Sequence, residues 1–307
     1  MKTFEQNYIL SPWNLSERAY ISIATTGLSP VKEHIFCTGL LLVKSDGSAH
    51  LSLYLSERLL DEKEVLLCIF AKTTDKSRII GYNVNHFLFP WIDSRSKYFH
   101  INDNAPKVII DMQSQLKNLS CWVPMDSISL KSVSKIAGYF RESVTLPQDL
   151  PGIFSDYIID GQPEYRDALF MHMRDDLLAM ASIDRWLQNR YLNLSIIHKE
   201  RTYKPLSVKI QGDMIVFSGL VNPSNDSYIN MGLTVYEEHD GKFTLEVAIN
   251  SDVYDKDRIC RFVLKPWKPD ESCSYDAPKG VYLLTVGKHL ISNHLWNLLN
   301  NIITEIL

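Results

Sequence analysis

Three apolar segments near the N-terminus, each ended by turn-forming residues, limit the folds that this chain can adopt. Residues 18–24 alternate in polarity and are broken by Thr25-Thr26-Gly27. Residues 35–43 form a second apolar run, Asp46-Gly47 supplies a hairpin turn, and residues 49–55 alternate again. The pattern predicts a three-stranded meander at the start of a sheet.

Helical and strand patterns follow one another through the next part of the chain. Helices are expected over 57–72, from Asp126-Ser127 to about Phe140, and from about Glu164 to Tyr191; short strands are expected over 78–82 and 107–110. The order β-β-β-α-β-α-β-α-α is typical of an α/β domain. We therefore expect a mixed sheet flanked by helices.

The pattern changes after about Leu194. Short β runs between residues 207 and 286 are separated by Gly, Pro, Asn and Asp, and a helix is expected over about 288–306. This predicts two domains, 1–195 and 200–307, of which the second is smaller and β-rich (α+β). The apolar face of the terminal helix fits packing on its own domain better than docking on a partner.

The charge of the chain excludes one mode of ligand binding. The sequence has 36 acidic and 32 basic residues, which gives a formal net charge of −4. Proteins that bind nucleic acid by bulk neutralisation of phosphates are strongly basic. Any contact of this chain with nucleic acid is therefore expected in a local groove.

Composition and apolar patterning indicate a globular chain outside the membrane. No apolar run approaches the roughly 20 residues that span a bilayer, and the N-terminus lacks the pattern of a signal peptide, so a cytoplasmic location is expected. The five cysteines include no C-x-x-C pair, which indicates reduced structural thiols. The histidines show no metal-ligand spacing such as H-E-x-x-H.

Five ordered segments carry the strongest functional signal. They are YISIATTGLSP (20–30), GYNVNHFLFPWI (81–92), SLKSVSK (129–135), DLPGIFSDY (149–157) and HMRDDLLAM (172–180). The first, second and fifth resemble the three motifs of DEDD-type 3′–5′ exonucleases, whose fold is RNase H-like. The other two resemble linking segments of the bacterial YprB-like branch. The resemblance covers residues ~18–190 and implies an RNase H-like domain.

The resemblance also implies where catalytic acids would lie, and three of them are missing. Hydrolysis in this family uses two Mg²⁺ or Mn²⁺ ions about 3.5–4 Å apart, held by four carboxylates. The corresponding positions here are Ser22, Ala24, Leu88 and Asp176, so only Asp176 keeps a carboxylate. His172, which in the family acts beside the attacking water, lies one helical turn before it. The exonuclease site is therefore interpreted as degenerate.

Two other acids are weighed as replacements. Asp175 adjoins Asp176, but successive helical residues point about 100° apart. Asp111 ends a predicted strand, where a helix or turn cap is its commoner role. Neither is expected to rebuild a two-metal site. The apolar side chain of Leu88 predicts that the former cleft is drier, or filled.

The motif residues that could contact nucleic acid are Thr26, Asn83, Phe87 and Lys131. Each also has a structural interpretation: Asn83 as a backbone-bonding turn residue, Phe87 as core, and the His172/Asp176 pair as a simple helix hydrogen bond. In the C-terminal region, Lys265, Trp267 and Lys268 form a small basic-aromatic cluster, which an ordinary loop also explains.

Two functional hypotheses follow. The first is a catalytically degenerate module with no resident cofactor, which either binds single-stranded nucleic acid or serves protein assembly with a nucleic-acid-processing protein. The alternative is an active 3′–5′ exonuclease with a remodelled site, which would use Mg²⁺ or Mn²⁺ through Asp176. The decisive structural question is whether the space between Ser22, Ala24, Leu88 and Asp176 is open or filled.

Overall fold

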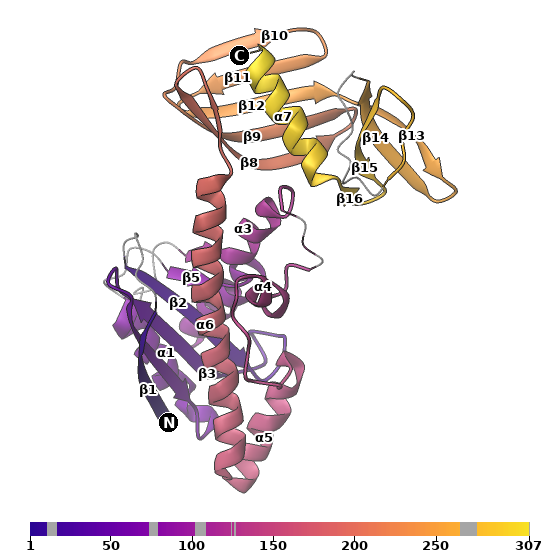
Figure 1. Cartoon of the computed structure of the whole chain (residues 1–307). Coiled ribbons are helices and arrows are strands. Elements are labelled where there is room, and N and C mark those ends of the chain that lie inside the picture. The colour runs from indigo at the N-terminus through magenta and orange to yellow at the C-terminus, as the bar shows by residue number, and fades with distance from the viewer. Residues whose placement is uncertain are drawn as a thin grey trace. The chain divides into compact units, whose positions relative to one another are not determined.

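The computed structural model describes residues 1–10, 17–73, 79–101, 109–123, 125, 127–264 and 275–306. The chain forms two compact units (Figure 1): unit 1 consists of Met1–Gln115 and Ser127–Leu187, and unit 2 of Leu116–Asp126 and Gln188–Leu307. Sequence patterning assigns Leu116–Asp126 to the first domain. The segment groups with unit 2 because Trp122 is buried in the core of that unit, where its ring lies 6.0 Å from that of Phe217.

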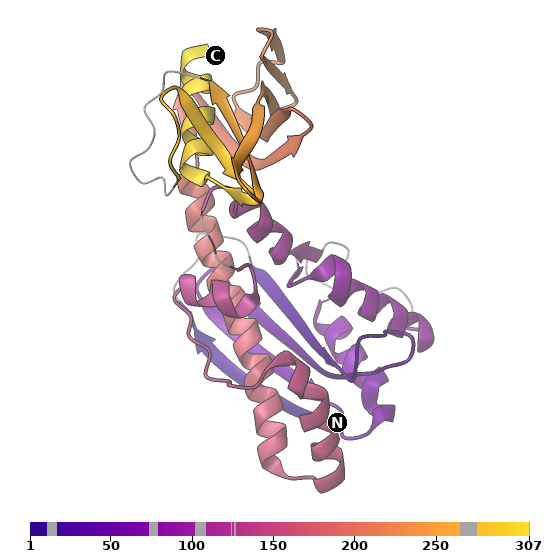
Figure 2. The same ribbon diagram turned by 90° about the vertical axis from the view of Figure 1, so that its right-hand side faces the viewer.

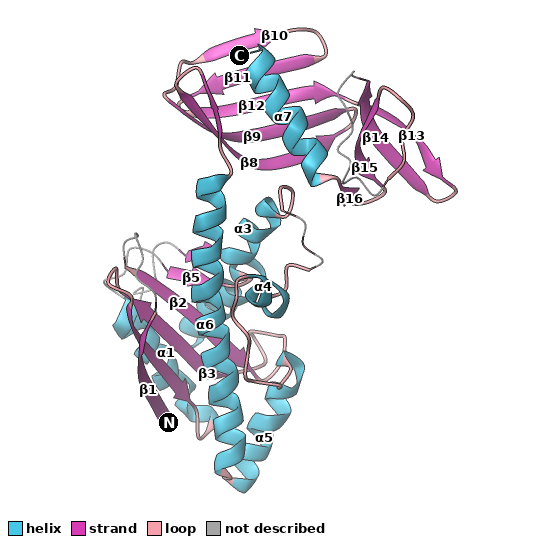
Figure 3. Ribbon diagram, in the orientation of Figure 1, coloured by secondary structure: helices cyan, strands magenta, loops and turns pink. Residues whose placement is uncertain are grey.

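The first fifteen elements build a mixed sheet and its helices (Figure 3). In chain order they are β1 (Lys2–Ile9), β2 (Arg18–Thr25), β3 (Ile35–Val43), β4 (Ser48–Leu55), η1 (Leu59–Asp61), α1 (Glu62–Thr73), β5 (Ile79–Gly81), η2 (Val84–Leu88), α2 (Phe89–Tyr98), β6 (Ile109–Asp111), α3 (Met112–Leu119), α4 (Leu130–Ile136), η3 (Pro147–Asp149), α5 (Leu150–Asp160) and α6 (Pro163–Asn193). The strand order is β1-β4-β3-β2-β5-β6. Strands β1 to β4 pair antiparallel, and β5 and β6 continue from β2 in parallel.

Alternation along β2 separates the two faces of this sheet. Ala19, Ile21 and Ile23 enter a core shared with α1 and α2. Tyr20 lies on the opposite face, and its hydroxyl donates to Asp184 Oδ2 of α6 at 2.8 Å. The sheet thus lies between α1 and α2 on one side and α6 on the other, an arrangement that can be followed in Figure 2. Ser22 and Ala24 share the α6 side with Tyr20 by this alternation.

Unit 2 contains two antiparallel sheets and the terminal helix. Its elements are β7 (Ile196–His198), β8 (Arg201–Gln211), β9 (Met214–Asn222), β10 (Ser227–Asn230), β11 (Thr234–His239), β12 (Lys242–Ala248), β13 (Asn250–Asp255), β14 (Arg258–Leu264), β15 (Val281–Val286), β16 (His289–Leu290) and α7 (Ser292–Ile306). The sheets have the orders β10-β11-β12-β9-β8-β7 and β13-β14-β15-β16. Helix α7 crosses the first sheet (Figure 1) and buries its apolar face in the core of its own unit.

The fold class predicted from sequence is confirmed: a mixed α/β sheet flanked by helices and then a β-rich region that ends in a helix. The meander of β2, β3 and β4 is also confirmed. Strand β1 and the helices α3 and α5 were not expected. Helix α4 begins at Leu130, later than predicted, because the Ser129 hydroxyl accepts from the Ser132 amide at 3.2 Å.

Some sequence-based predictions fall partly outside the described residues. Cys37, Cys68, Cys121 and Cys260 are free thiols, and burial raises the pKa of the Cys37 thiol. Cys273 and the Lys265, Trp267 and Lys268 cluster lie outside the described residues, as does Asp126.

Candidate functional site

The turn after β5 presents the second motif. Asn83 adopts a left-handed conformation, with φ 53° and ψ 46°, and its carbonyl accepts from the amides of Phe87 and Leu88 at 3.0 and 3.3 Å. The turn brings Leu88 back over Gly81, where a Cβ atom would lie 2.5 Å from Leu88 Cδ2. Leu88 is thus buried and packed against Gly81, the last residue of β5. Only glycine at position 81 permits this approach.

Helix α6 presents the third motif. His172 Nε2 lies 3.6 Å from Asp176 Oδ2, and His172 Nδ1 lies 3.2 Å from the carbonyl oxygen of Thr145, to which it donates. Burial lowers the pKa of His172, and the positive charge of Arg141 lowers it further, against the opposing effect of Asp176. His172 is therefore neutral at pH 7, and its Nδ1 proton is used to hold the backbone at Thr145.

Asp176 already has a cationic partner. Arg141 Nη1 donates to Asp176 Oδ1, and the side chains are 10% and 17% exposed. Arg141 belongs to the stretch between α4 and η3, called here the 137–146 segment. A guanidinium paired with a carboxylate forms a strong charge-assisted bond. The negative charge that a divalent cation would need is thereby neutralised within the protein.

The neighbouring acids are engaged as well. Asp175 is fully buried and accepts from the Tyr139 hydroxyl at 3.0 Å and from the Ser143 amide at 2.6 Å. Asp111 accepts from the Gln113 amide at 3.0 Å and from the Ser114 hydroxyl at 3.2 Å, so it caps the start of α3. Neither carboxylate lines the space beside Asp176.

The motif residues converge on a cavity of about 640 Å³ within unit 1. Its walls come from β2, the turn after β5, the start of α4, the start of α5 and the middle of α6. The lining residues are Ile21, Ser22, Ile23, Ala24, Thr25, Gly27, Leu28, Tyr82, Asn83, Phe87, Leu88, Leu130, Pro147, Gln148, Leu150, Pro151, His172, Met173, Asp176 and Met180. Of the two alternatives that Leu88 suggested, a drier cleft or a filled one, the filled one does not apply: Leu88 packs on Gly81 and lines the cavity.

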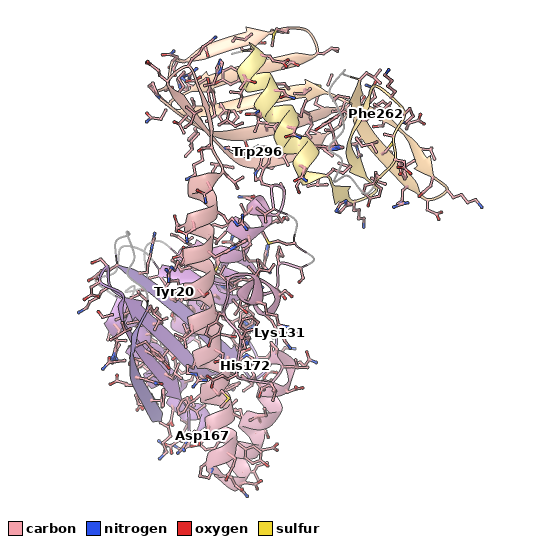
Figure 4. The ribbon with its side chains drawn as sticks, viewed as in Figure 1. Tyr20, Lys131, Asp167, His172, Phe262 and Trp296 are labelled. Atoms are coloured by element: carbon pink, nitrogen blue, oxygen red, sulfur yellow. The ribbon has the colours of Figure 1, made fainter. Side chains whose placement is uncertain are left out.

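Two predicted contact residues lie outside this lining. The Thr26 hydroxyl donates to Glu33 Oε2 at 2.8 Å and accepts from the His34 amide at 3.0 Å, so it serves the loop after β2. Lys131 is exposed on α4, one residue after Leu130, which does line the cavity. Tyr20, Lys131 and His172 are labelled in Figure 4 on their three elements. The structure brings together Ser22, Ala24, Asn83, Phe87, Leu88, His172 and Asp176.

The donor set does not fit the two cations of the exonuclease-type site. Among the described residues, no three His, Cys, Asp or Glu side chains gather in a way that could hold a metal ion. Ser22 offers a neutral hydroxyl, Ala24 and Leu88 offer no ligand, and Asp176 is paired with Arg141. Hard divalent cations need several oxygen ligands to replace their water.

Arg141 is the functional residue that sequence reasoning misses. It lies 35 positions before Asp176, in a segment that belongs to no helix or strand. No local pattern marks such a pair. Gln148 is likewise a cavity residue without a sequence signal. Tyr82, which belongs to the second motif, also lines the cavity, and its hydroxyl donates to the carbonyl of Ile128 just before α4.

Comparison with known families decides the assignment. The family model of the RNase_H superfamily matches residues 19–188, more than half of the chain. The chain belongs to the RNase H superfamily. The RNase H match begins inside β2 and ends in α6, and so covers every lining residue of the cavity.

Solved structures similar to this member of the RNase H superfamily include several of exonuclease I. The first is an exonuclease I structure said to suggest how processivity is achieved. It has 14% identity and a TM-score of 0.37, and the match covers 67% of this chain and 55% of that one. E. coli exonuclease I in complex with a dT13 oligonucleotide has 12% identity and a TM-score of 0.40, with 66% and 55% covered. An ExoI/SSB-Ct complex has 13% identity and a TM-score of 0.35, with 69% and 56% covered.

The chain therefore spans little more than half the length of the exonuclease I structures it matches. A search of curated proteins found no match to it. Among the described helices, none has the length and apolar character needed to cross a bilayer.

Proposed function

We propose that unit 1 binds the 3′ end of a single nucleic-acid strand in its cavity and does not hydrolyse it. One observation carries the proposal: the motif positions of an exonuclease-type site surround an open cavity of about 640 Å³, while Asp176, its one lining carboxylate among the described residues, is paired with Arg141. Membership of the RNase H superfamily supports a nucleic-acid ligand.

The chemistry of the cavity suits a nucleoside. Its volume lies within the roughly 300–1,000 Å³ of typical ligand sites. The rings of Tyr82 and Phe87 offer faces for a base, and base–aromatic stacking contributes about 1–3 kcal/mol per base. Asn83 and Gln148 offer amide donors and acceptors. The pairing of Asp176 with Arg141 removes a charge that would repel phosphate.

The same geometry argues against hydrolysis. Two-metal hydrolysis needs cations that polarise the phosphate and generate the attacking hydroxide. The lining residues give one carboxylate, already neutralised, and His172 is neutral with its Nδ1 proton committed to Thr145. Two other functions compete with this proposal. One is an active exonuclease with a remodelled metal site, and the other is a role in protein assembly.

Filling the cavity is expected to weaken strand binding at least tenfold. Ala24 is buried in the lining, so Ala24→Trp places an indole where the base would lie. Phe87→Ala is a milder change that removes a stacking face. The measurement is fluorescence anisotropy with a 5′-labelled twelve-nucleotide single strand, as DNA and as RNA, in EDTA.

Ala71→Trp is the matched control, because Ala71 is exposed on α1 at the other face of the sheet. Circular dichroism verifies that each variant is folded. Equal affinity of the wild type and both cavity variants, or no binding of either strand by the wild type, would contradict the proposal. A copurifying protein in the absence of strand binding would favour the assembly role.

A further inference from the structure

The 137–146 segment has two different edges. Between Tyr139 and Thr145 the odd-numbered residues contact α6: the Tyr139 hydroxyl and the Ser143 amide donate to Asp175, Arg141 pairs with Asp176, and the Thr145 carbonyl accepts from His172. The even-numbered residues face solvent. Phe140 is 73% exposed, Val144 91% and Leu146 39%. The odd-numbered residues hold the segment on α6, and the even-numbered residues present apolar side chains to solvent.

Helix α4 leads from the cavity to this exposed edge. Leu130, its first residue, lines the cavity, and the Tyr139 amide donates to the Ser134 carbonyl at 2.8 Å. Gly138, with φ +82°, makes the reversal possible. Phe140 therefore lies four residues beyond Ile136, the last residue of α4. Pro147, just beyond the segment, lines the cavity again. The exposed surface formed by Lys131, Lys135 and Phe140, called here the α4 surface, therefore lies between two lining residues in sequence, Leu130 and Pro147.

This surface carries a local positive charge. Lys131 and Lys135 are exposed four residues apart and so share one face of α4. Neither forms an ion pair within the described part of the chain. Glu142, the acid of the segment, is paired with Arg174 at 2.7 Å. The two lysines therefore keep their positive charge available beside the lining residue Leu130, within the part of the chain that the structure describes.

We propose that a single strand held in the cavity continues over α4, with phosphates at Lys131 and Lys135 and a base stacked on Phe140. Lysines beside an exposed ring match the alternation of charge and base along a strand. A protein partner could bind the exposed apolar side chains of the segment without any contact to Lys131 and Lys135. A nucleic-acid strand uses both the lysines and the ring. The inference rests on the proposed function, because the strand must first enter the cavity.

The test compares a short strand that fills only the cavity with a longer one. The probes are 5′-labelled dT2 and dT12, titrated against the full chain at several salt concentrations. Removing the surface in Lys131→Gln/Lys135→Gln/Phe140→Ala is expected to weaken dT12 binding at least tenfold and to leave dT2 binding unchanged. The slope of log K against log[salt] for dT12 is expected to fall by about 1.4, at about 0.7 per phosphate.

Lys44→Gln/Lys63→Gln, which removes two exposed lysines from other elements, is the control and is expected to change neither affinity. If both strands bind and the surface variant weakens them equally or not at all, the inference is overturned while the proposed function stands. If neither strand binds the wild type, the proposed function itself fails. A copurifying protein lost only from the surface variant would also overturn the inference.

Discussion

Replacing Asp175 by alanine is expected to lower the free energy of unfolding of unit 1 by about 3–5 kcal/mol. The carboxylate is 0% exposed and accepts from the Tyr139 hydroxyl, the Ser143 amide and the Arg174 guanidinium. Without it, the Tyr139 hydroxyl and the Ser143 amide lose their acceptor, and a buried donor without a partner costs about 1–3 kcal/mol; Arg174 keeps its pair with Glu142. The 137–146 segment loses the main bonds that hold it to α6.

Urea-dependent hydrogen exchange of the α6 amides measures this effect for unit 1 separately from unit 2. Asp167→Ala on the same helix is the matched control: its side chain is 60% exposed and pairs with the adjacent Arg166. We expect that control to change the unfolding free energy by less than about 0.5 kcal/mol. A change below about 1 kcal/mol for Asp175→Ala would show that the segment is not held by this carboxylate.

Restoring carboxylates around the cavity is expected to create a metal response that the wild type lacks. The variant carries Ser22→Asp, Ala24→Glu and Leu88→Asp, with Arg141→Gln to release Asp176. Four acids without cations repel one another, so the variant gains stability only when a divalent cation binds. At a Mn²⁺ concentration 100 times the Kd, the gain is about 2.7 kcal/mol. For a unit of this size that corresponds to a rise in Tm of roughly 5–10 °C.

Thermal unfolding in MnCl₂ and in EDTA measures the response. The neutral set Ser22→Asn, Ala24→Gln, Leu88→Asn and Arg141→Gln keeps the side-chain sizes and is expected to show no shift. The wild type is expected to behave like the neutral set, since its one lining carboxylate is paired with Arg141. An equal rise in the wild type would favour the alternative of a remodelled metal site.

Strand and helix periodicity is sufficient to place most motif residues. Alternation on β2 puts Ser22 and Ala24 on the side of Tyr20, and a four-residue spacing puts His172 and Asp176 on one face of α6. These local rules predict the sheet and the long helix, because each rule depends on neighbours in sequence. The convergence of the motif positions on one site was implied by the resemblance to DEDD-type exonucleases.

What the sequence hides depends on long-range contacts. Strand β1 is a sheet edge with mostly exposed side chains, so it has no apolar alternation to detect. The Arg141–Asp176 pair joins residues 35 positions apart through an irregular segment. The packing of Leu88 on Gly81 joins residues only seven positions apart, but no periodicity predicts it.

The fate of a labelled strand in the presence of Mn²⁺ tests the central claim most directly. A 5′-labelled single strand is incubated with the wild-type chain and Mn²⁺, and its length is followed on a denaturing gel while anisotropy reports binding. The account predicts that the strand is bound and keeps its full length. Progressive shortening from the 3′ end that disappears in Asp176→Asn would contradict it.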